Sequence, residues 1–147
     1  MSKPRPVPFG TTIRVRDTCL CLHARRAARA LARHYDEALR PLQLTNGQFS
    51  LMMALNRPDP PAMGEVASLL AMDRTTLTAN LKPLERRGLV RVSADAKDRR
   101  SRRMVLTPAG EQLLAAALPL WESAQAEAEA RLGSDPDALR AGLLALC

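Results

Sequence analysis

Aromatic residues are scarce in this chain of 147 residues, which has one Trp, one Tyr and two Phe. Proteins that read single-stranded RNA stack aromatic side chains on unpaired bases, so the scarcity argues against RNA recognition. The chain also has only two histidines and no phosphate-cradling glycine loop. Since no nucleophile, base and orienting residue occur in a plausible order, we predict that it is not an enzyme.

Long apolar runs are also missing, and cysteine is sparse. No apolar stretch approaches the ~20 residues of a membrane-spanning helix. The N-terminal sequence MSKPRPVPFG has cations and prolines where a signal peptide has its hydrophobic core. We therefore expect a cytoplasmic protein without membrane contact. Three cysteines in a reducing compartment do not predict a disulfide framework. We also expect neither a cofactor nor a bound metal ion.

The net charge of +7 is unevenly distributed along the chain. Residues 73–103 hold ten Lys and Arg against four Asp and Glu, a net of +6, and residues 1–40 also reach +6. Residues 104–147 instead carry a net charge of −4. Positive charge is thus concentrated in two segments, as a surface that binds DNA phosphates requires.

The clearest structural pattern begins at Asp73, which has the short acceptor side chain of a helix N-cap. Three leucines then recur at spacings of four and three, and Gly88 follows where a glycine ends a helix. These signals predict a helix over 74–87, bent at Pro83. Its polar face combines cations, hydroxyls and an amide, which suit base edges in a major groove about 12 Å wide. The residues of this face are Arg74, Thr75, Thr76, Thr78, Asn80 and Lys82.

After this helix the pattern changes to that of β-strands. Residues 89–93 and 102–106 are β-compatible, and the polar connection 94–101 is too long for a two-residue turn. Together with a short helix expected over 63–70, the segment predicts a winged helix-turn-helix within a mainly helical chain. The wing is placed to reach phosphates or a minor groove. Its cations are Lys97, Arg99 and Arg100.

Other start and stop signals predict the remaining elements. After an extended arm of twelve residues, whose prolines disfavour a helix, we expect a first long helix over 17–39. Thr45 and Thr107 have the positions of N-caps, and Gln48 completes a capping box with the first of them. The helix over 63–70 is expected to present Val66, Leu69 and Leu70 to the core.

Three motifs in the winged segment resemble the MarR family of bacterial transcriptional regulators. The chain reads MDRTTLTANLKPLERRGLV along the recognition helix, DAKDRR in the wing and LTPAG at the start of the next helix. The resemblance implies a DNA-binding regulator, expected to be a repressor, with helix 74–87 in the major groove and wing 94–101 at the minor groove. In similar proteins an ion pair shapes the wing. That pairing would make Asp98 and Arg100 structural and leave Arg99 or Lys97 to touch DNA.

The resemblance also implies how the rest of the single domain, 1–147, is used. MarR-like chains pair their terminal helices across a two-fold axis, so residues 13–40 and 108–147 are expected to dimerise and 45–106 to form the DNA-binding lobe. A homodimer presents two recognition helices ~34 Å apart, which matches a pseudo-palindromic operator of double-stranded DNA. A small aromatic or anionic ligand is expected to release the DNA. A winged helix that only binds other proteins is the rival interpretation.

Cys19 and Cys21 suggest a different signal. The run LCLHARRAARAL resembles the first helix of the organic-peroxide-sensing branch of the MarR family and aligns Cys21 with the sensing cysteine. Thiol-based redox sensing through Cys21, with Cys19 beside it, is therefore an alternative to a ligand switch. On one helix the two thiols point about 200° apart and are not easily bridged. Two alternative interpretations are that both cysteines are small buried apolar residues, or that Cys19 and His23 form a metal-sensing pair.

Overall fold

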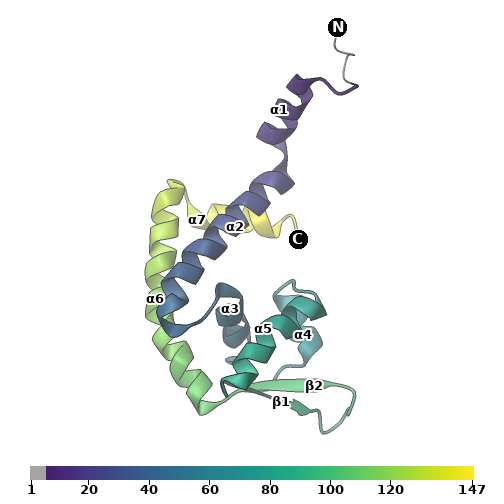
Figure 1. The fold of residues 1–147 in the computed structure, drawn as a ribbon, viewed down its shortest axis with the longest axis vertical. Helices are drawn as coiled ribbons and strands as arrows, with labels where there is room; N and C mark the ends of the chain where they lie inside the picture. The colour runs from purple at the N-terminus through teal and green to yellow at the C-terminus, as the bar shows by residue number, and fades with distance from the viewer. Residues whose placement is uncertain (1–5) are drawn as a thin grey trace. The chain divides into compact units, whose positions relative to one another are not determined.

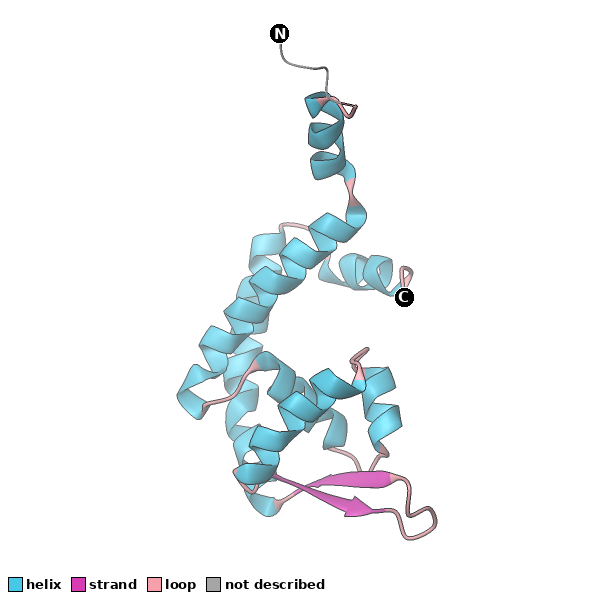
Figure 2. Cartoon of the chain, turned by 45° about the vertical axis from the view of Figure 1, so that its right-hand side comes forward, coloured by secondary structure: helices cyan, strands magenta, loops and turns pink. Residues whose placement is uncertain are grey.

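A computed structural model describes residues 6–147, and within this range the regular elements are helices and one two-stranded hairpin (Figure 1, Figure 2). The prediction of a mainly helical chain with a small β-hairpin is confirmed. The chain forms two compact units, Met1–His34 and Tyr35–Cys147. In chain order the elements are α1 (Phe9–Thr18), α2 (Leu20–Leu39), the 3-10 turn η1 (Arg40–Leu42), α3 (Asn46–Leu55), α4 (Met63–Leu69), α5 (Arg74–Arg86), β1 (Val90–Ala94), β2 (Arg102–Leu106), α6 (Pro108–Leu132) and α7 (Pro136–Leu144).

The N-terminal helix begins earlier than predicted. Part of the expected extended arm, residues 1–5, lies outside the described residues, but α1 already starts at Phe9. Pro8 is the N-cap residue, with an extended backbone, and its carbonyl oxygen accepts a hydrogen bond from the backbone N–H of Thr11 at 3.0 Å. Proline is tolerated at this end of a helix because its missing N–H is not needed there. Pro8 therefore marks the start of α1 and does not prevent it.

The expected continuous helix over 17–39 is wrong, because the backbone becomes extended at Cys19 (φ −70°, ψ 110°). The hydroxyl of Thr18 donates to the carbonyl oxygen of Arg14 at 2.7 Å, and a ring nitrogen of His23 lies 2.8 Å from the carbonyl oxygen of Cys19. Side chains that bond nearby backbone groups compete with helical geometry and bend or interrupt helices. The two cysteines therefore do not share one regular helix, as the sequence interpretation assumed.

The core of the second unit is built around α3, which contacts α4, α5, α6 and β2. The start of this helix has a clear cause in the sequence. The backbone N–H of Gln48 donates to the hydroxyl of Thr45 at 3.2 Å, and the Gln48 side chain accepts from the Thr45 N–H at 3.1 Å. The predicted capping box is thus confirmed. Each large side chain buried in this core contributes about 1.5–3 kcal/mol relative to an exposed one. The most deeply buried are Leu39, Leu51, Met52, Leu77, Leu84 and Met104.

Helix α4 lies at the edge of this core. Val66 is 1% exposed as predicted, but Leu69 is 71% exposed, so the expectation that it faces the core is wrong. Met63 and Ala67 of this short helix, and Leu70 directly after it, are partly buried against the core beside Val66, so the predicted core contact of Leu70 is confirmed and Leu69 lies on the outward side. The turn into α5 then passes through Ala71, whose φ of 49° is left-handed. This turn, with α4 and α5, forms the helix-turn-helix.

The hairpin and the start of α6 are joined tightly. The hydroxyl of Thr107 accepts from the backbone N–H of Gly110 at 3.1 Å and donates to the carbonyl oxygen of Gly88 at 2.6 Å. The predicted N-cap at Thr107 is therefore confirmed. A β-carbon at Gly110 would overlap the carbonyl oxygen of Leu89, so only glycine fits there. Among the described residues, the helices are too short or too polar to cross a lipid bilayer.

Candidate nucleic-acid interface

Helix α5 has the start, stripe and end that its sequence predicts. The backbone N–H of Thr76 donates to the carboxylate of Asp73 at 2.7 Å, which lowers the pKa of Asp73 below its ordinary value. The helix continues through Pro83 to Arg86, and Gly88 follows with a φ of 70°. The buried stripe consists of Leu77, Leu81 and Leu84.

The opposite face of α5 is open and polar. It carries a shallow hollow of about 390 Å³. Arg74 lies at the N-terminal end of this face and Lys82 two turns later, with the hydroxyls of Thr75 and Thr78 between them. Cations at both ends can bind phosphates on the two sides of a groove, and the hydroxyls can donate to or accept from base edges. The residues that line the hollow are Arg74, Thr75, Thr78, Ala79 and Lys82.

The other two residues predicted for this face have local partners. The amide nitrogen of Asn80 donates to the carbonyl oxygen of Thr76 at 3.0 Å. The amide oxygen of Asn80 lies beside Gly47, where a β-carbon would approach it to 2.9 Å. Asn80 therefore lies at the contact between α3 and α5, whereas the side chain of Thr76 is in the exposed first turn of α5.

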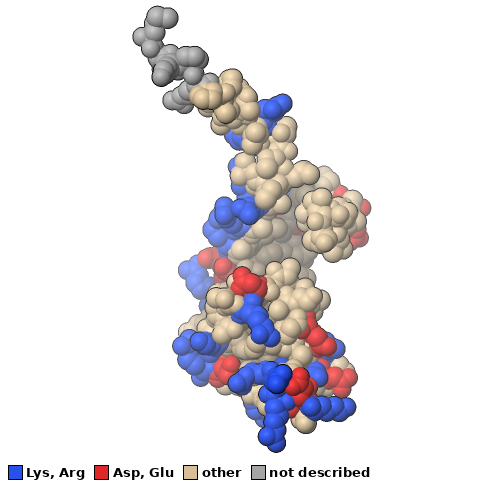
Figure 3. Space-filling model, turned by 90° about the vertical axis from the view of Figure 1, so that its right-hand side faces the viewer, with Lys and Arg blue, Asp and Glu red and all other residues tan. Residues whose placement is uncertain are grey.

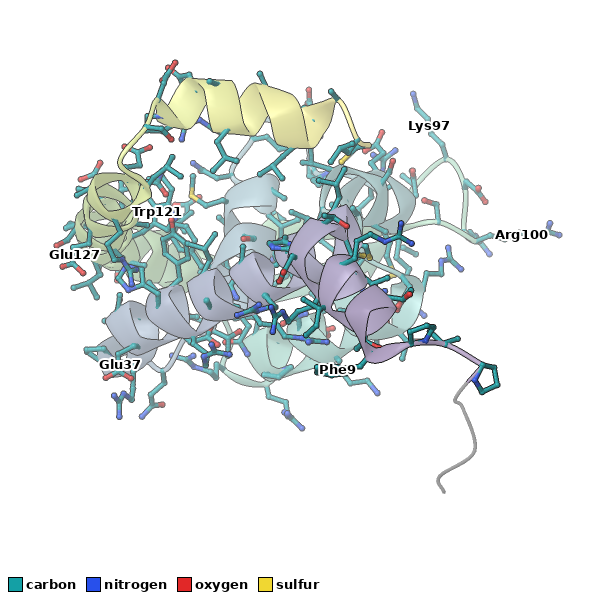
Figure 4. All side chains as sticks on the ribbon, turned by 90° about the horizontal axis from the view of Figure 1, so that it is seen from above. Phe9, Glu37, Lys97, Arg100, Trp121 and Glu127 are labelled. Atoms are coloured by element: carbon teal, nitrogen blue, oxygen red, sulfur yellow. The ribbon has the colours of Figure 1, made fainter. Side chains whose placement is uncertain are left out.

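The hairpin forms the predicted wing. Its two strands are antiparallel, with Val90 paired to Leu106 and Ala94 to Arg102, and the connecting loop spans residues 95–101. In Figure 3, Lys and Arg side chains gather at the end of the molecule where this hairpin lies. Lys97 and Arg100 project outward from the wing loop (Figure 4). The three cations predicted for the wing, Lys97, Arg99 and Arg100, are all exposed.

Asp95 shapes the wing loop. Its carboxylate accepts from the backbone N–H of Lys97 at 2.9 Å and forms an ion pair with Arg103 at 2.8 Å. These two contacts, the backbone hydrogen bond first, hold the pKa of Asp95 below its ordinary value. Arg103 also donates to the carbonyl oxygen of Pro60 at 2.9 Å, which ties the base of the wing to the loop before α4.

The wing ion pair therefore differs from the one that the family resemblance suggested. The carboxylate of Asp98 accepts a hydrogen bond from the backbone N–H of Arg100 at 3.0 Å, and the ion pair joins Asp95 to Arg103 instead. The hairpin register explains the difference, because it pairs Ser93 with Arg103 and so places Arg103 near Asp95 at the base of the loop. The side chain of Arg100 is left projecting outward (Figure 4).

Arg87, which the sequence analysis did not single out, holds the end of the recognition helix. Its guanidinium donates to the carbonyl oxygen of Gln43 at 2.7 Å and to that of Leu42 at 3.0 Å. Gln43 directly follows η1 and has a left-handed φ of 54°. Arg87 therefore joins the C-terminal end of α5 to the segment that follows α2. An arginine at a helix end is a weak signal, because only the tertiary structure shows which carbonyl groups it reaches.

None of the three cysteines belongs to α4, α5 or the wing. Cys19 is half-buried, while Cys21 and Cys147 are exposed, and all three are free thiols. The interpretation of Cys19 and Cys21 as buried apolar residues therefore does not hold for Cys21 in the single chain. Within residues 6–147, no group of three His, Cys, Asp or Glu side chains is arranged to hold a metal ion. The proposed metal pair of Cys19 and His23 gains no third ligand there.

Comparisons with known proteins agree with this geometry. Residues 44–101 match the model of the MarR family. The chain is 40% identical over 98 residues to the transcriptional regulator HosA of Escherichia coli O157:H7, which covers 65% of this chain and 71% of HosA. The M. tuberculosis transcriptional regulator MosR, solved in complex with DNA, has 44% identity and a TM-score of 0.78, covering 87% of this chain and 92% of MosR. Bordetella bronchiseptica BpsR, whose DNA binding is regulated by 6-hydroxynicotinic acid, has 26% identity and a TM-score of 0.74, covering 88% of this chain and 90% of BpsR.

Proposed function

Since the chain belongs to the MarR family of DNA-binding transcriptional regulators, we propose that it acts as a homodimeric repressor on a pseudo-palindromic operator. The observation that carries the proposal is the exposed polar face of α5 beside a basic wing. In this proposal α5 enters the major groove, and the wing loop 95–101 reaches the minor groove or the adjacent phosphates. The site of action is the cytoplasm, where the chromosome is accessible.

The homodimer is supported by apolar surface that the single chain leaves exposed. Leu20 and Leu31 on α2 are 70% and 41% exposed, and Leu143 and Leu144 on α7 are 46% and 72% exposed. Leucines exposed on each of these terminal helices support an interface, since large apolar surfaces are normally covered by a partner. Two-fold pairing through residues 13–40 and 108–147 would set two copies of α5 about one helical turn of DNA, ~34 Å, apart.

DNA recognition is divided between phosphates and bases in this proposal. Arg74 and Lys82 contact the backbone on either side of the major groove, while Thr75 and Thr78 read base edges. Of the wing cations, Arg99 and Lys97 contact phosphates, and the outward-pointing Arg100 joins them. Thr76 supports the start of α5, and Asn80 keeps α5 in contact with α3.

The experiment that tests this role is fluorescence anisotropy with DNA from upstream of the protein's own gene, against an unrelated duplex of equal length. We expect specific binding that weakens steeply as salt rises. The double variant Arg74→Ala/Lys82→Ala should lose it, while Arg131→Ala, which removes an exposed cation from the last turn of α6, should not. Absence of salt-dependent DNA binding would falsify the proposal and favour a protein-interaction module.

Regulation by a small ligand is the second part of the proposal. BpsR, a protein with a similar fold, has its DNA binding regulated by 6-hydroxynicotinic acid, which is both aromatic and acidic. By analogy, a small aromatic or anionic effector would bind a dimer conformation whose two recognition helices no longer match the operator spacing. Repression then ends because the effector stabilises the state that does not bind DNA. Reporter expression from the operator should rise when the gene is deleted.

A thiol switch is the alternative signal, and the exposure of Cys21 supports it. In this alternative an organic hydroperoxide transfers one oxygen atom to the Cys21 thiolate, forming a sulfenic acid and leaving as the alcohol after protonation. Cys19, at the helix interruption two residues away, is the nearest thiol in the sequence. Loss of operator binding with hydroperoxide, recovery with dithiothreitol and resistance of Cys21→Ser would establish this switch. If the wild type and Cys21→Ser respond to hydroperoxide in the same way, the thiol switch is excluded.

A further inference from the structure

Helix α7 is joined to α6 by polar contacts. It turns away from the end of α6 after Gly133, whose φ of 69° is left-handed (Figure 1). Residues 137–147 are all described and all exposed, so within them no apolar side chain is buried against α6. The guanidinium of Arg140 instead donates to the carboxylate of Glu129 on α6 at 2.9 Å. It also donates to the carboxylate of Asp137, in the first turn of α7, at 2.6 Å. Arg140 therefore fixes α7 to α6.

Glu129 continues these contacts along α6. Its carboxylate accepts from the side-chain amide nitrogen of Gln125 at 2.7 Å, and the amide oxygen of Gln125 accepts from the hydroxyl of Tyr35 near the end of α2. These two bonds hold the Gln125 amide in one orientation, because its nitrogen can only donate and its oxygen can only accept. We call Tyr35, Gln125, Glu129 and Arg140 the α6 network. It joins residues of α2, α6 and α7.

The α6 network ends at an aromatic stack. The rings of Tyr35 and Trp121 have centroids 6.4 Å apart and planes inclined by 15°, and those of Phe49 and Trp121 are 6.0 Å apart and inclined by 19°. These separations are typical of offset-stacked aromatic pairs. Trp121 belongs to α6, and Phe49 belongs to α3, the helix that contacts α5. Continuous contacts therefore lead from α7 to the helix that supports the recognition helix.

The protonation states within the network depend on one another. The hydrogen bond from Arg140 first, and that from Gln125 second, lower the pKa of Glu129. The pKa of Tyr35 is raised, chiefly by burial and then by the nearby charge of Glu129. An ionised Glu129 therefore accepts from Arg140 and Gln125 together, while Tyr35 keeps the proton that it donates. Without Arg140, this carboxylate would lose its charged and stronger partner and turn toward water, which leaves the Gln125 amide free to reorient.

From these contacts we infer that Arg140 is a positioning residue for DNA recognition. It fixes α7 on α6 and, through the α6 network, holds the ring of Tyr35 against Trp121 beside α3. The position of the C-terminal helix thereby affects operator affinity, although α7 does not contact DNA in the proposed complex. The inference rests on the proposed DNA-binding homodimer, in which the exposed leucines of α7 pack against a second copy. Dimer contacts at α7 and the support of α5 are then coupled through Arg140.

The exposure of the ion pair separates this role from a merely structural one. The side chains of Arg140 and Glu129 are 51% and 36% exposed. Exposed ion pairs contribute little to stability, so Arg140→Met should leave thermal unfolding nearly unchanged. A change at Trp121, which belongs to the stack and not to the ion pair, is expected only if the network transmits it.

The first test follows the fluorescence of Trp121, the single tryptophan of the chain, in the full-length, DNA-free protein. Arg140→Met should raise the acrylamide quenching of Trp121 by about two-fold, because a released Tyr35 ring covers it less. The control Arg131→Met removes an exposed cation from the last turn of α6 and should leave the quenching unchanged.

A second background identifies the route. Tyr35→Phe keeps the ring and lacks the hydroxyl, so in this background Arg140→Met should cause no further quenching of Trp121. Unchanged quenching in Arg140→Met alone, or an equal increase in the Tyr35→Phe background, overturns the inference.

The second test measures operator affinity by anisotropy, at concentrations where sedimentation shows that wild type and variants are dimeric. Arg140→Met should bind the operator about five-fold more weakly, whereas Arg131→Met should bind it as tightly as the wild type. Circular dichroism shows whether each variant is folded. Wild-type operator affinity in a folded Arg140→Met variant overturns the inference.

The two proposals can fail separately. A wild type that binds no DNA but shows the expected quenching changes would refute the regulator role and still support Arg140 as the residue that positions α7. Operator binding by a wild type whose Trp121 does not respond to Arg140→Met would refute the inference alone.

Discussion

The carboxylate of Asp95 and the guanidinium of Arg103 lie 2.8 Å apart at the base of the wing, and Arg103 continues to the carbonyl oxygen of Pro60. The wing loop is thereby fixed to the lobe from which it projects. We expect Arg103→Met to release the loop and weaken operator binding by about ten-fold, because wing contacts must then be ordered on binding. Anisotropy titrations measure this, and thermal unfolding should change little. Unaltered affinity would show that the loop needs no such anchor.

A salt titration of DNA binding should distinguish the residues that contact phosphates from those that contact bases. Lys97→Gln and Arg99→Gln should each reduce the slope of log affinity against log salt by about one, with similar losses on all DNA sequences. Thr75→Val should instead alter the preference among operator variants and leave that slope unchanged. Arg131→Gln serves as the control for removal of a distant positive charge. A changed slope in the threonine variant would contradict the proposed division of roles.

The close approach at Gly110 predicts that alanine substitutions at Gly110 and Gly142 change the free energy of unfolding in opposite directions. Gly110→Ala places a β-carbon on the carbonyl oxygen of Leu89 and should lower the free energy of unfolding by about 1–3 kcal/mol. Gly142→Ala, within α7, meets nothing within 4 Å and should raise it by ~0.4–1 kcal/mol. Urea denaturation of the two variants measures both changes. Similar effects at the two positions would mean that the chain around Leu89 can relax.

The cap of the recognition helix should make stability depend on pH. The pKa of Asp73 is lowered in the folded chain, chiefly by the hydrogen bond from the backbone N–H of Thr76, so its ionised form favours folding. This contribution is complete above the ordinary Asp pKa, ~3.9, and is lost as pH falls through the lower folded value. Asp73→Asn keeps a capping acceptor that does not titrate. The melting temperature of the wild type should therefore fall relative to that of Asp73→Asn as the solution is acidified, and parallel curves would refute this.

Local signals account for what could be predicted from the sequence. The caps at Thr45, Asp73 and Thr107 and the glycine at Gly88 act on adjacent backbone groups, so the elements that they bound were placed within a residue or two. The three family motifs lie in the same segment, and the comparisons confirm both the family and the expectation that its members are not enzymes. The individual DNA contacts stay predictions.

The remaining features depend on contacts between distant residues. The break at Cys19 combines two side chains that bond nearby carbonyl groups, and neither alone predicts an interruption. The pairing of Asp95 with Arg103 follows from the strand register, and Arg87 reaches carbonyl groups more than forty positions earlier in the chain. The stack of Tyr35, Phe49 and Trp121 joins three helices and has no pattern in the sequence. Such features appear only when the fold is known.

The hydrogen bonds from Arg87 to the carbonyl groups of Leu42 and Gln43 fix the C-terminal end of α5, so any tilt of this helix turns about that end. The residues proposed to contact DNA begin at Arg74, at the opposite, N-terminal end of this helix of 13 residues. Such a helix is about 20 Å long, so a rotation of about 5° at the pivot moves its N-terminus by ~1.7 Å. That displacement is comparable to half the length of a hydrogen bond. A small tilt near η1 is therefore geometrically amplified where the protein would meet its operator.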